Sequence, residues 1–391
     1  NPKTADPNDN RNASQSQSPG SVKVSQLYLN INHEYGSLLA GRAPRQFGLG
    51  ITYNAGTGPF DHWADTHDVV GYKFRINNFY FMPMFGRIYD EDYGQGLNST
   101  DEIYEFYYDS KDSGSLIGLT IEKRKASAGA NVASPAGIGG VGSTRVGEWT
   151  SNQSNFVLGR SWESFSFKLE GGFLTADTGV QTAIGENVRM NGYGFASELN
   201  FRPKESNFDW DLRFGMASGD DPATTDVNEG FQFDRNYDVA MLLFNHRLGQ
   251  ADFLGTGRSR PSTSPTPAGV VAIDQFNSPD DEAISNAAYL SPKMIYNWTE
   301  KLALNTTLTY AQLMKSQTGT LDAKMDLGFE VDFDVAYHMT ENVLWSNQIG
   351  LLFPGSAFRD GVTGYDVGFT YGFSSRAAIQ IGRASCRERV S

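Results

Sequence analysis

Apolar and polar side chains alternate strictly along several stretches of the chain, which is the pattern of a β-strand with one apolar face. In the clearest stretch, residues 325–337, apolar side chains at odd positions alternate with Asp326, Glu330, Asp332 and Asp334. The same pattern is strong in 164–173, 208–216 and 365–373. It is weaker near 22–31, 36–43, 68–76, 78–86, 102–109, 115–124, 153–160, 191–201, 237–246, 286–297, 302–313 and 342–353. The alternation therefore predicts many long antiparallel strands.

The lengths of these stretches favour strands that cross a membrane. A tilted membrane strand needs about 9–11 residues, whereas strands of soluble proteins average about 5–6. We therefore predict an all-β fold, a single transmembrane antiparallel up-and-down β-barrel of about 16–18 strands. The barrel would span residues 21–380.

The links between the predicted strands alternate between short and long. Short links lie at 77–78, 110–114, 161–163, 202–207, 299–300 and 338–341. Long polar links lie near 44–67, 87–101, 125–152, 175–190 and 218–236. Outer-membrane barrels have short periplasmic turns and long extracellular loops, so this alternation predicts which end is which. Four tryptophans lie near the predicted short-turn end and are candidates for an aromatic girdle at the membrane interface. They could instead be ordinary core residues. They are Trp162, Trp210, Trp298 and Trp345.

Both ends of the chain and one internal link fit this scheme less simply. Residues 1–20 read as a polar loop of a truncated start, which leads us to expect a strand upstream. Residues 381–391, with Cys386, resemble the translated read-through of a sequencing adapter, and we expect this tail to be non-native. Strand directions counted from the two ends disagree at 247–285. Either a strand at 269–276 is missed, which we prefer, or this link crosses the lumen.

Composition adds two constraints. The chain has 391 residues and a formal net charge of -13, which argues against nucleic acid as a partner. It contains no run of about 18 apolar residues for a transmembrane helix. The modest share of hydrophobic residues, 39%, is compatible with a barrel because only every second residue of a strand faces lipid.

Charged positions on the alternating strands are expected to face the lumen. A charge on the lipid face costs about 2–4 kcal/mol at mid-membrane for Lys or Arg, and less for Asp or Glu. These side chains can form a selectivity surface or simply solvate a wet wall. The candidate pore-lining residues are Lys73, Arg75, Lys168, Glu170, Asp209, Asp211, Arg213, Asp326, Glu330, Asp332, Asp334 and Asp366.

Metal, cofactor and catalytic sites have little support in the sequence. The acidic loop with Asp220, Asp221 and Asp226 is a weak metal candidate, because its spacing does not match an EF-hand and a solvated loop explains it. His62 and His67, with Asp65, form a second unspecific set. The chain has five histidines and no Gly-x-Ser-x-Gly nucleophile elbow. We therefore expect no enzyme activity, no catalytic residues and no cofactor.

Two stretches resemble the alginate-export porin family and its porin-like relatives. One is Leu-Leu-Ala-Gly-Arg-Ala-Pro-Arg-Gln-Phe-Gly-Leu-Gly at 38–50, and the other is Met-Ala-Ser-Gly-Asp-Asp-Pro at 216–222 followed by Phe231, Phe233 and Tyr237. The resemblance implies an 18-stranded monomeric barrel that exports an anionic polysaccharide through a basic lumen. The acidic C-terminal half departs from that pattern, so a general or cation-leaning porin is the preferred interpretation.

The sequence therefore predicts a porin-like channel of a Gram-negative outer membrane. It would pass small hydrophilic solutes, ions or a polysaccharide passively. Its surroundings would be outer-membrane lipid and lipopolysaccharide, with monomer and homotrimer both open. One alternative is a structural or adhesive barrel whose lumen is closed by loops. Another is a soluble carbohydrate-active β-protein.

Overall fold

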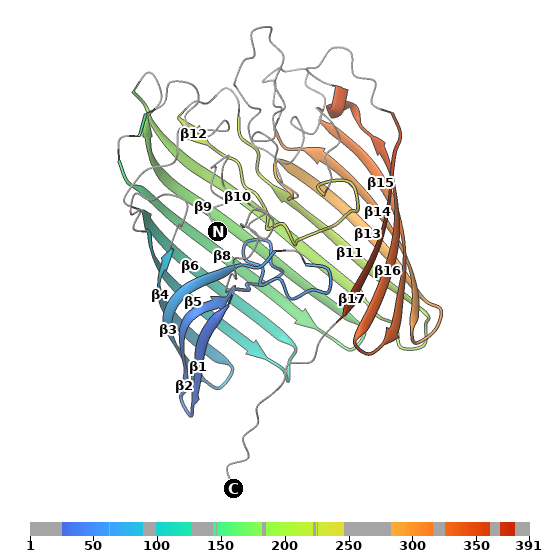
Figure 1. Cartoon of the computed structure of the whole chain (residues 1–391), viewed down its shortest axis with the longest axis horizontal. Coiled ribbons are helices and arrows are strands. Elements are labelled where there is room, and N and C mark those ends of the chain that lie inside the picture. Colours follow the sequence, from blue (N-terminus) through green and yellow to red (C-terminus); the bar gives the residue numbers. More distant parts are fainter. Residues whose placement is uncertain are drawn as a thin grey trace, which may run out of the picture.

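The computed structural model is an antiparallel up-and-down β-barrel (Figure 1). It describes residues 26–61, 63–88, 99–126, 144–145, 147–181, 185–221, 224, 226–245, 283–315, 325–359 and 368–379. Within these ranges the sheet has 17 strands, which confirms the predicted all-β fold and agrees with the predicted range of about 16–18 strands. In chain order these are β1 (Leu27–His33), β2 (Gly36–Pro44), β3 (Thr66–Ile76), β4 (Phe79–Ile88), β5 (Ser99–Ser110), β6 (Ser115–Ala126), β7 (Thr144–Arg145), β8 (Trp149–Ser161), β9 (Phe165–Gln181), β10 (Asn187–Phe201), β11 (Phe208–Ala217), β12 (Val227–Asn228), β13 (Ala287–Asn297), β14 (Leu302–Leu313), β15 (Asp326–Thr340), β16 (Val343–Pro354) and β17 (Thr370–Ile379).

Each long strand pairs antiparallel with the next one along the chain. The two-residue strands stand outside this series, so β6 pairs with β8 and β11 pairs with β13, while β7 adds to β9 and β12 adds in parallel to β10. The links between paired strands are short at one end of the barrel and mostly long at the other, where the link at 182–186 is the short exception (Figure 1). A single turn of 3-10 helix, Ser356–Arg359, follows β16. Within the described ranges, no helix is long and apolar enough to cross a bilayer.

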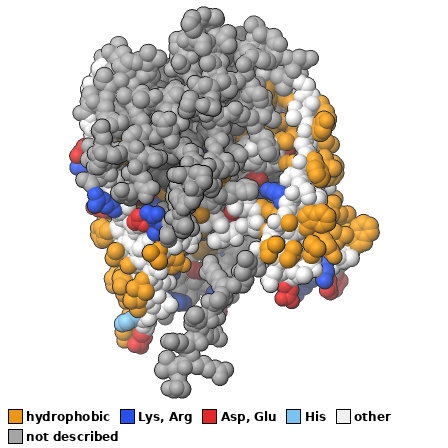
Figure 2. Space-filling view, in the orientation of Figure 1, with side chains coloured by type: hydrophobic (Ala, Val, Ile, Leu, Met, Phe, Trp, Pro, Cys, Tyr) orange, Lys and Arg blue, Asp and Glu red, His pale blue; other side chains and the backbone are white. Residues whose placement is uncertain are grey.

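The alternation divides the side chains between the two faces of the wall as predicted. On β15, Phe333 is 46% exposed on the outside, whereas its neighbour Asp332 is 8% exposed and Glu330 is fully buried on the inside. Figure 2 shows apolar side chains spread over the outer wall, with charged side chains near the lower edge. Large apolar groups exposed to this extent over a whole wall require an apolar solvent. The barrel is therefore built to stand in a membrane.

Two predicted elements differ in the structure. The predicted link at 175–190 is mostly strand, because β9 continues to Gln181 and β10 begins at Asn187. These strand ends lie beyond the apolar belt, where no lipid face is needed and polar residues occupy both sides. The predicted strand at 237–246 is wrong: the part that the structure describes, 237–245, is a connection whose apolar side chains are buried inside the barrel.

This second difference resolves the conflict in strand direction. Once 237–246 is removed from the strand count, both ends of the chain place the long link after β11 at the same end of the barrel. β11 also pairs directly with β13, so no strand from the link between them stands there in the sheet. The predicted strand at 269–276 lies outside the described residues. Residues 1–20, 246–282 and 381–391 lie outside the described residues.

Candidate functional site

Two connections at the long-loop end fold back into the lumen (Figure 1). We call residues 45–65 inner loop A and residues 229–245 inner loop B. Inner loop A turns sharply at Gly48 and Gly50, whose φ angles are +51° and +87°. At this turn the side chain of Glu170, on β9, accepts backbone N–H groups from Leu49 at 2.6 Å and from Gly50 at 2.9 Å. The wall carboxylate thus holds the tip of inner loop A.

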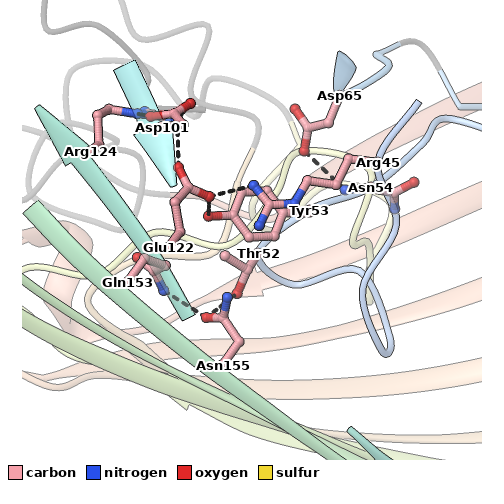
Figure 3. A network of polar contacts seen from close by, with 10 residues as sticks. All are labelled: Arg45, Thr52, Tyr53, Asn54, Asp65, Asp101, Glu122, Arg124, Gln153 and Asn155. Atoms are coloured by element: carbon pink, nitrogen blue, oxygen red, sulfur yellow. Dashed lines mark hydrogen bonds and ion pairs between the residues drawn. The ribbon is translucent and has the colours of Figure 1, made fainter. Parts of the chain in front are cut away.

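A buried charge network holds the start of the same loop against β5 and β6 (Figure 3). Arg45 donates to Glu122, and Arg124 donates to the other oxygen of Glu122 at 2.7 Å. Arg124 also pairs with Asp101 at 2.8 Å. The guanidinium of Arg45 lies 3.4 Å from the ring centre of Tyr53. Because all four charges are almost fully buried and paired, removing any one would leave an uncompensated charge away from water.

Tyr53 completes the network as a hydrogen-bond donor. Its hydroxyl donates to Glu122 at 2.5 Å. Burial raises the pKa of the Tyr53 hydroxyl well above its ordinary value, although the nearby guanidinium of Arg45 opposes the shift. The phenol therefore keeps its proton and remains a donor across the physiological pH range. Next to it, Thr52 donates to Asn155 on β8 at 3.1 Å, a second link between the loop and the wall (Figure 3).

Inner loop B is held on the opposite wall by carboxylates of β15. Glu330 accepts the backbone N–H groups of Leu242 and Leu243 at 2.6 and 2.7 Å. Asp332 accepts that of Met241 at 3.2 Å. Three hydrogen bonds to carboxyl oxygens of one strand therefore fix the backbone of the loop.

Apolar packing and wall hydroxyls secure the rest of inner loop B. Leu243 and Tyr237 are buried in one cluster with Tyr289 of β13. The carbonyl of Val239 accepts hydrogen bonds from two wall hydroxyls at 3.1 and 3.0 Å, those of Ser291 and Thr309. The centre of the barrel is therefore partly dry, and the aromatic residues of inner loop B belong to it.

The two inner loops touch each other inside the lumen. The N–H of Asp234 donates to the carbonyl of Ile51 at 2.6 Å. The side chain of Asn236 donates to the carbonyl of Trp63 at 2.9 Å and accepts its N–H at 3.3 Å. Inner loop A also reaches β17, where the guanidinium of Arg376 lies 4.7 Å from the ring centre of Phe60. Together the loops cross the lumen and narrow it.

Most acidic candidates from the sequence hold other groups in place. Glu170, Glu330 and Asp332 bind the inner loops as described. Asp334 accepts from Asn305 at 2.7 Å and from Ser346 at 2.6 Å. A further pair, Asp209 and Asp211, lies beside Arg202, with Asp211 at 2.5 Å. Asp366 lies outside the described residues.

Asp326 is not on the same face as the other acidic residues of β15. The backbone has a bulge at Gly328, where φ is +89° and the register with β14 shifts. The bulge reverses the alternation, so Leu327 is buried in the inner cluster and Asp326 bonds to the exposed Tyr310. The expectation that all four acidic side chains face the lumen is therefore wrong for Asp326.

The basic candidates have fewer charged partners. The ammonium of Lys73 lies 3.7 Å from the ring centre of Tyr80, and Arg75 donates to a turn carbonyl at 3.3 Å. Arg213 donates to the carbonyl of Asp238 at 2.5 Å. Lys168 lies half-buried on β9. The structure brings none of these cations into an ion pair with an acidic candidate among the described residues.

Sequence reasoning missed the network around Glu122. Glu122 continues the alternation set by Ile117, Leu119 and Ile121 on β6, so its inward direction could have been predicted. Arg124 stands between Lys123 and Lys125, where the sequence shows no apolar face. Nothing in the local pattern of inner loop A indicates that Arg45 and Tyr53 would meet them, because that contact depends on how the loop folds back.

The weak metal candidates are engaged otherwise. Asp221 pairs with Lys315 at 3.1 Å, and this hydrogen bond raises the pKa of the lysine. Asp226 pairs with Arg189 at 3.1 Å, and Asp220 accepts a backbone N–H at 3.1 Å. No group of three or more potential metal ligands occurs in the described parts of the chain. His62 lies outside them.

The four tryptophans of the predicted girdle are all exposed. Trp162 and Trp298 follow strands that end at short links, and Trp210 and Trp345 lie near the starts of strands that begin there. They therefore share the short-turn end of the barrel.

Comparison with known proteins finds matches only among solved structures. No family model and no curated protein matches the chain. The outer membrane protein OpdK of Pseudomonas aeruginosa is 9% identical, with 90% of this chain and 78% of that chain covered and a TM-score of 0.46. OccK11 (OpdR) of Pseudomonas aeruginosa is 9% identical, with 90% and 80% covered and a TM-score of 0.44. OprD of Pseudomonas aeruginosa is 8% identical, with 88% and 75% covered and a TM-score of 0.42.

Proposed function

We propose that this protein is a porin-like channel of the bacterial outer membrane that passes small hydrophilic solutes and ions passively. The observation that carries the proposal is the opposite chemistry of the two faces of one wall. Exposed aromatic and aliphatic side chains cover the outside, while charged and polar side chains lie inside. A soluble carbohydrate-active protein would not present such an outer wall to water.

The inner loops set the size of what can pass. They attach to opposite sides of the barrel, inner loop A at β6 and β9 and inner loop B at β15. A large open pore is therefore not expected, and the passage that remains favours small solutes over a polymer. This supports general solute passage over the polysaccharide export that the alginate-export resemblance implies.

Charge in the lumen supports a weak preference for anions. Glu170, Glu330 and Asp332 are occupied by the backbone of the inner loops. Among the described residues, Lys168 and Lys293 have no carboxylate within ion-pair distance, although Glu198 is opposite Lys168 in the sheet. Cations that remain accessible attract anions into a narrow passage. We therefore propose this preference in place of the cation preference predicted from sequence.

A second candidate is a structural or adhesive barrel that the loops close completely. The contact between Asp234 and Ile51 in the lumen favours it. Reconstitution of the folded protein in planar bilayers separates the two. Stable ohmic steps in the intact protein support the channel. A folded barrel that conducts only after inner loop B is deleted supports the closed barrel.

The outer surface of the barrel wall supports the proposed contacts with the membrane. The exposed tryptophans are proposed as an interfacial girdle, in contact with outer-membrane lipid and lipopolysaccharide. We infer no catalytic role and no cofactor. Monomer and homotrimer both agree with the described surface.

A further inference from the structure

The outer wall carries a shallow groove of about 560 Å³ across β3 to β6. Its walls are two rows of side chains that run across the strands. In one row Phe74, Phe81, Phe106 and Leu119 are paired in register from strand to strand. Phe81 stacks on Phe106 with ring centres 4.6 Å apart and an interplanar angle of 23°.

The second row lies two residues nearer to the short turns. It consists of Ile76, Phe79, Tyr108 and Ile117, again paired in register. Two residues along a strand span roughly 7 Å, and the groove is also lined by Tyr80, Tyr107 and Gly118, which lie between the two rows in sequence. Both rows belong to the apolar face of the wall, and several of these side chains are more than half exposed, such as Ile76 and Phe79.

A charged turn lies on the short-turn side of the groove, beyond its second row. The link between β5 and β6 contains Lys111 and Asp112, both exposed, directly beyond Tyr108 and Ile117. The neighbouring link at 77–78 is Asn-Asn and carries no charge. A cation and an anion side by side at the edge of an apolar slot match a molecule with a hydrocarbon chain and a headgroup of both signs.

We propose that this groove binds a phospholipid with a zwitterionic amine headgroup. An acyl chain would lie in the groove and leave it past Tyr108 and Ile117, so that its phosphate would meet Lys111 and its ammonium would meet Asp112. In a membrane a hollow of this size must be filled, because empty space forfeits the contacts of every lining atom. The proposal rests on the membrane position of the wall and not on conductance.

Native mass spectrometry of the barrel released from nanodiscs tests the proposal. The discs hold equal amounts of phosphatidylethanolamine and phosphatidylglycerol, and lipid that stays bound is counted and identified. We expect the intact protein to retain phosphatidylethanolamine in preference. Because aromatic rings supply much of the contact area, the Phe81→Ala/Phe106→Ala variant should retain about ten-fold less lipid.

A matched control comes from the other side of the barrel. Phe329 and Phe353 stack on the outer wall with the same centre distance, 4.6 Å, and an angle of 16°, but do not line the groove. Phe329→Ala/Phe353→Ala should retain as much lipid as the intact protein. Equal loss in both double variants, or loss in neither, would overturn the proposal. If the intact protein forms dimers and the Phe81→Ala/Phe106→Ala variant alone does not, a second copy of the chain occupies the groove. That result would also overturn the proposal.

A turn variant tests the headgroup without changing the groove. Lys111→Gln/Asp112→Asn should keep bound lipid but lose the preference for phosphatidylethanolamine. This turn variant also tests lipid binding if Phe81→Ala/Phe106→Ala does not fold. An unchanged preference in this variant would contradict the headgroup assignment. A barrel that retains the lipid but does not conduct would contradict the channel function alone.

Discussion

The backbone N–H of Asp234 and the carbonyl of Ile51 are joined by a 2.6 Å hydrogen bond inside the barrel. These residues are 183 positions apart in the chain and belong to the two inner loops. Each loop is separately held to the wall by carboxylates, so the contact joins two supported segments rather than two free ones. The bore of the channel therefore depends on a small number of buried polar bonds.

Loss of the β15 carboxylates should widen the passage. In Glu330→Ala/Asp332→Ala, inner loop B loses three hydrogen bonds to carboxyl oxygens, each worth about 0.5–1.5 kcal/mol. We expect larger single-channel conductance and more frequent closures in planar bilayers. The control is Asp334→Asn on the same strand, since Asp334 bonds to wall side chains and not to the loop. Equal conductance in the double variant and the intact protein would show that inner loop B does not limit flow.

Gly48 should be required for the turn of inner loop A. A Cβ there would lie 2.6 Å from an oxygen of Glu170, and the residue has a positive φ. Gly185→Ala is the matched control, because it also has a positive φ but no atom within 4 Å of the added Cβ. The backbone cost of about 1–2 kcal/mol is common to both. Gly48→Ala should therefore lower the unfolding temperature, read by gel mobility, more than Gly185→Ala. Equal lowering would contradict the contact with Glu170.

The charge network around Glu122 should make a large contribution to stability. Glu122→Gln leaves Arg45 and Arg124 buried with reduced compensation, and breaking a buried pair typically costs about 3–5 kcal/mol. Lys125→Gln on the same strand removes an exposed pair with Glu148, worth at most about 1 kcal/mol. Urea unfolding of the two variants in detergent or lipid measures the difference. Similar losses in both would mean that the network is hydrated and weak.

Alkaline pH should weaken the same network through Tyr53. Burial raises the pKa of its hydroxyl, so the folded state holds the proton more tightly than the unfolded state, whose pKa is about 10. The stabilisation is fully present below that value and is lost as the pH rises above it. The unfolding temperature should fall less steeply above pH ~10 in Tyr53→Phe than in the intact protein. Identical slopes would show that Tyr53 does not contribute.

Removal of the unpaired lumen cations should change ion selectivity. Lys168→Gln/Lys293→Gln should move the reversal potential in a salt gradient toward cations, with a larger effect at low salt because screening is weaker there. Lys301→Gln is the control, because Lys301 lies on the exposed short turn at 298–301. This change removes one positive charge outside the lumen. A shift of equal size in the control would place the selectivity at the mouth instead.

The sequence predicted the wall well because a strand with one lipid face must alternate. Residues 329–335 follow this rule closely, and the short links mark where it stops. The rule failed at Asp326, since the bulge at Gly328 reverses the alternation. It also failed at 237–246, because a short apolar run reads the same in a strand and in a buried connection.

The candidate site was less accessible to sequence reasoning. That Glu170, Glu330 and Asp332 point inward followed from alternation. That they bind backbone N–H groups of loops about 90 or more positions away did not, because no local pattern encodes which loop folds inward. Inner loop A was expected to lie outside the barrel, and its glycines became meaningful only beside Glu170.

The central claim is that lipid surrounds the aromatic face of this barrel and that a narrow water-filled passage remains beside the inner loops. Single-channel recording of the folded, intact protein in planar bilayers tests it most directly. The account predicts small, ohmic, stepwise currents that grow in Glu330→Ala/Asp332→Ala. A heat-modifiable, correctly folded barrel that inserts into bilayers and carries no current in either form would contradict it.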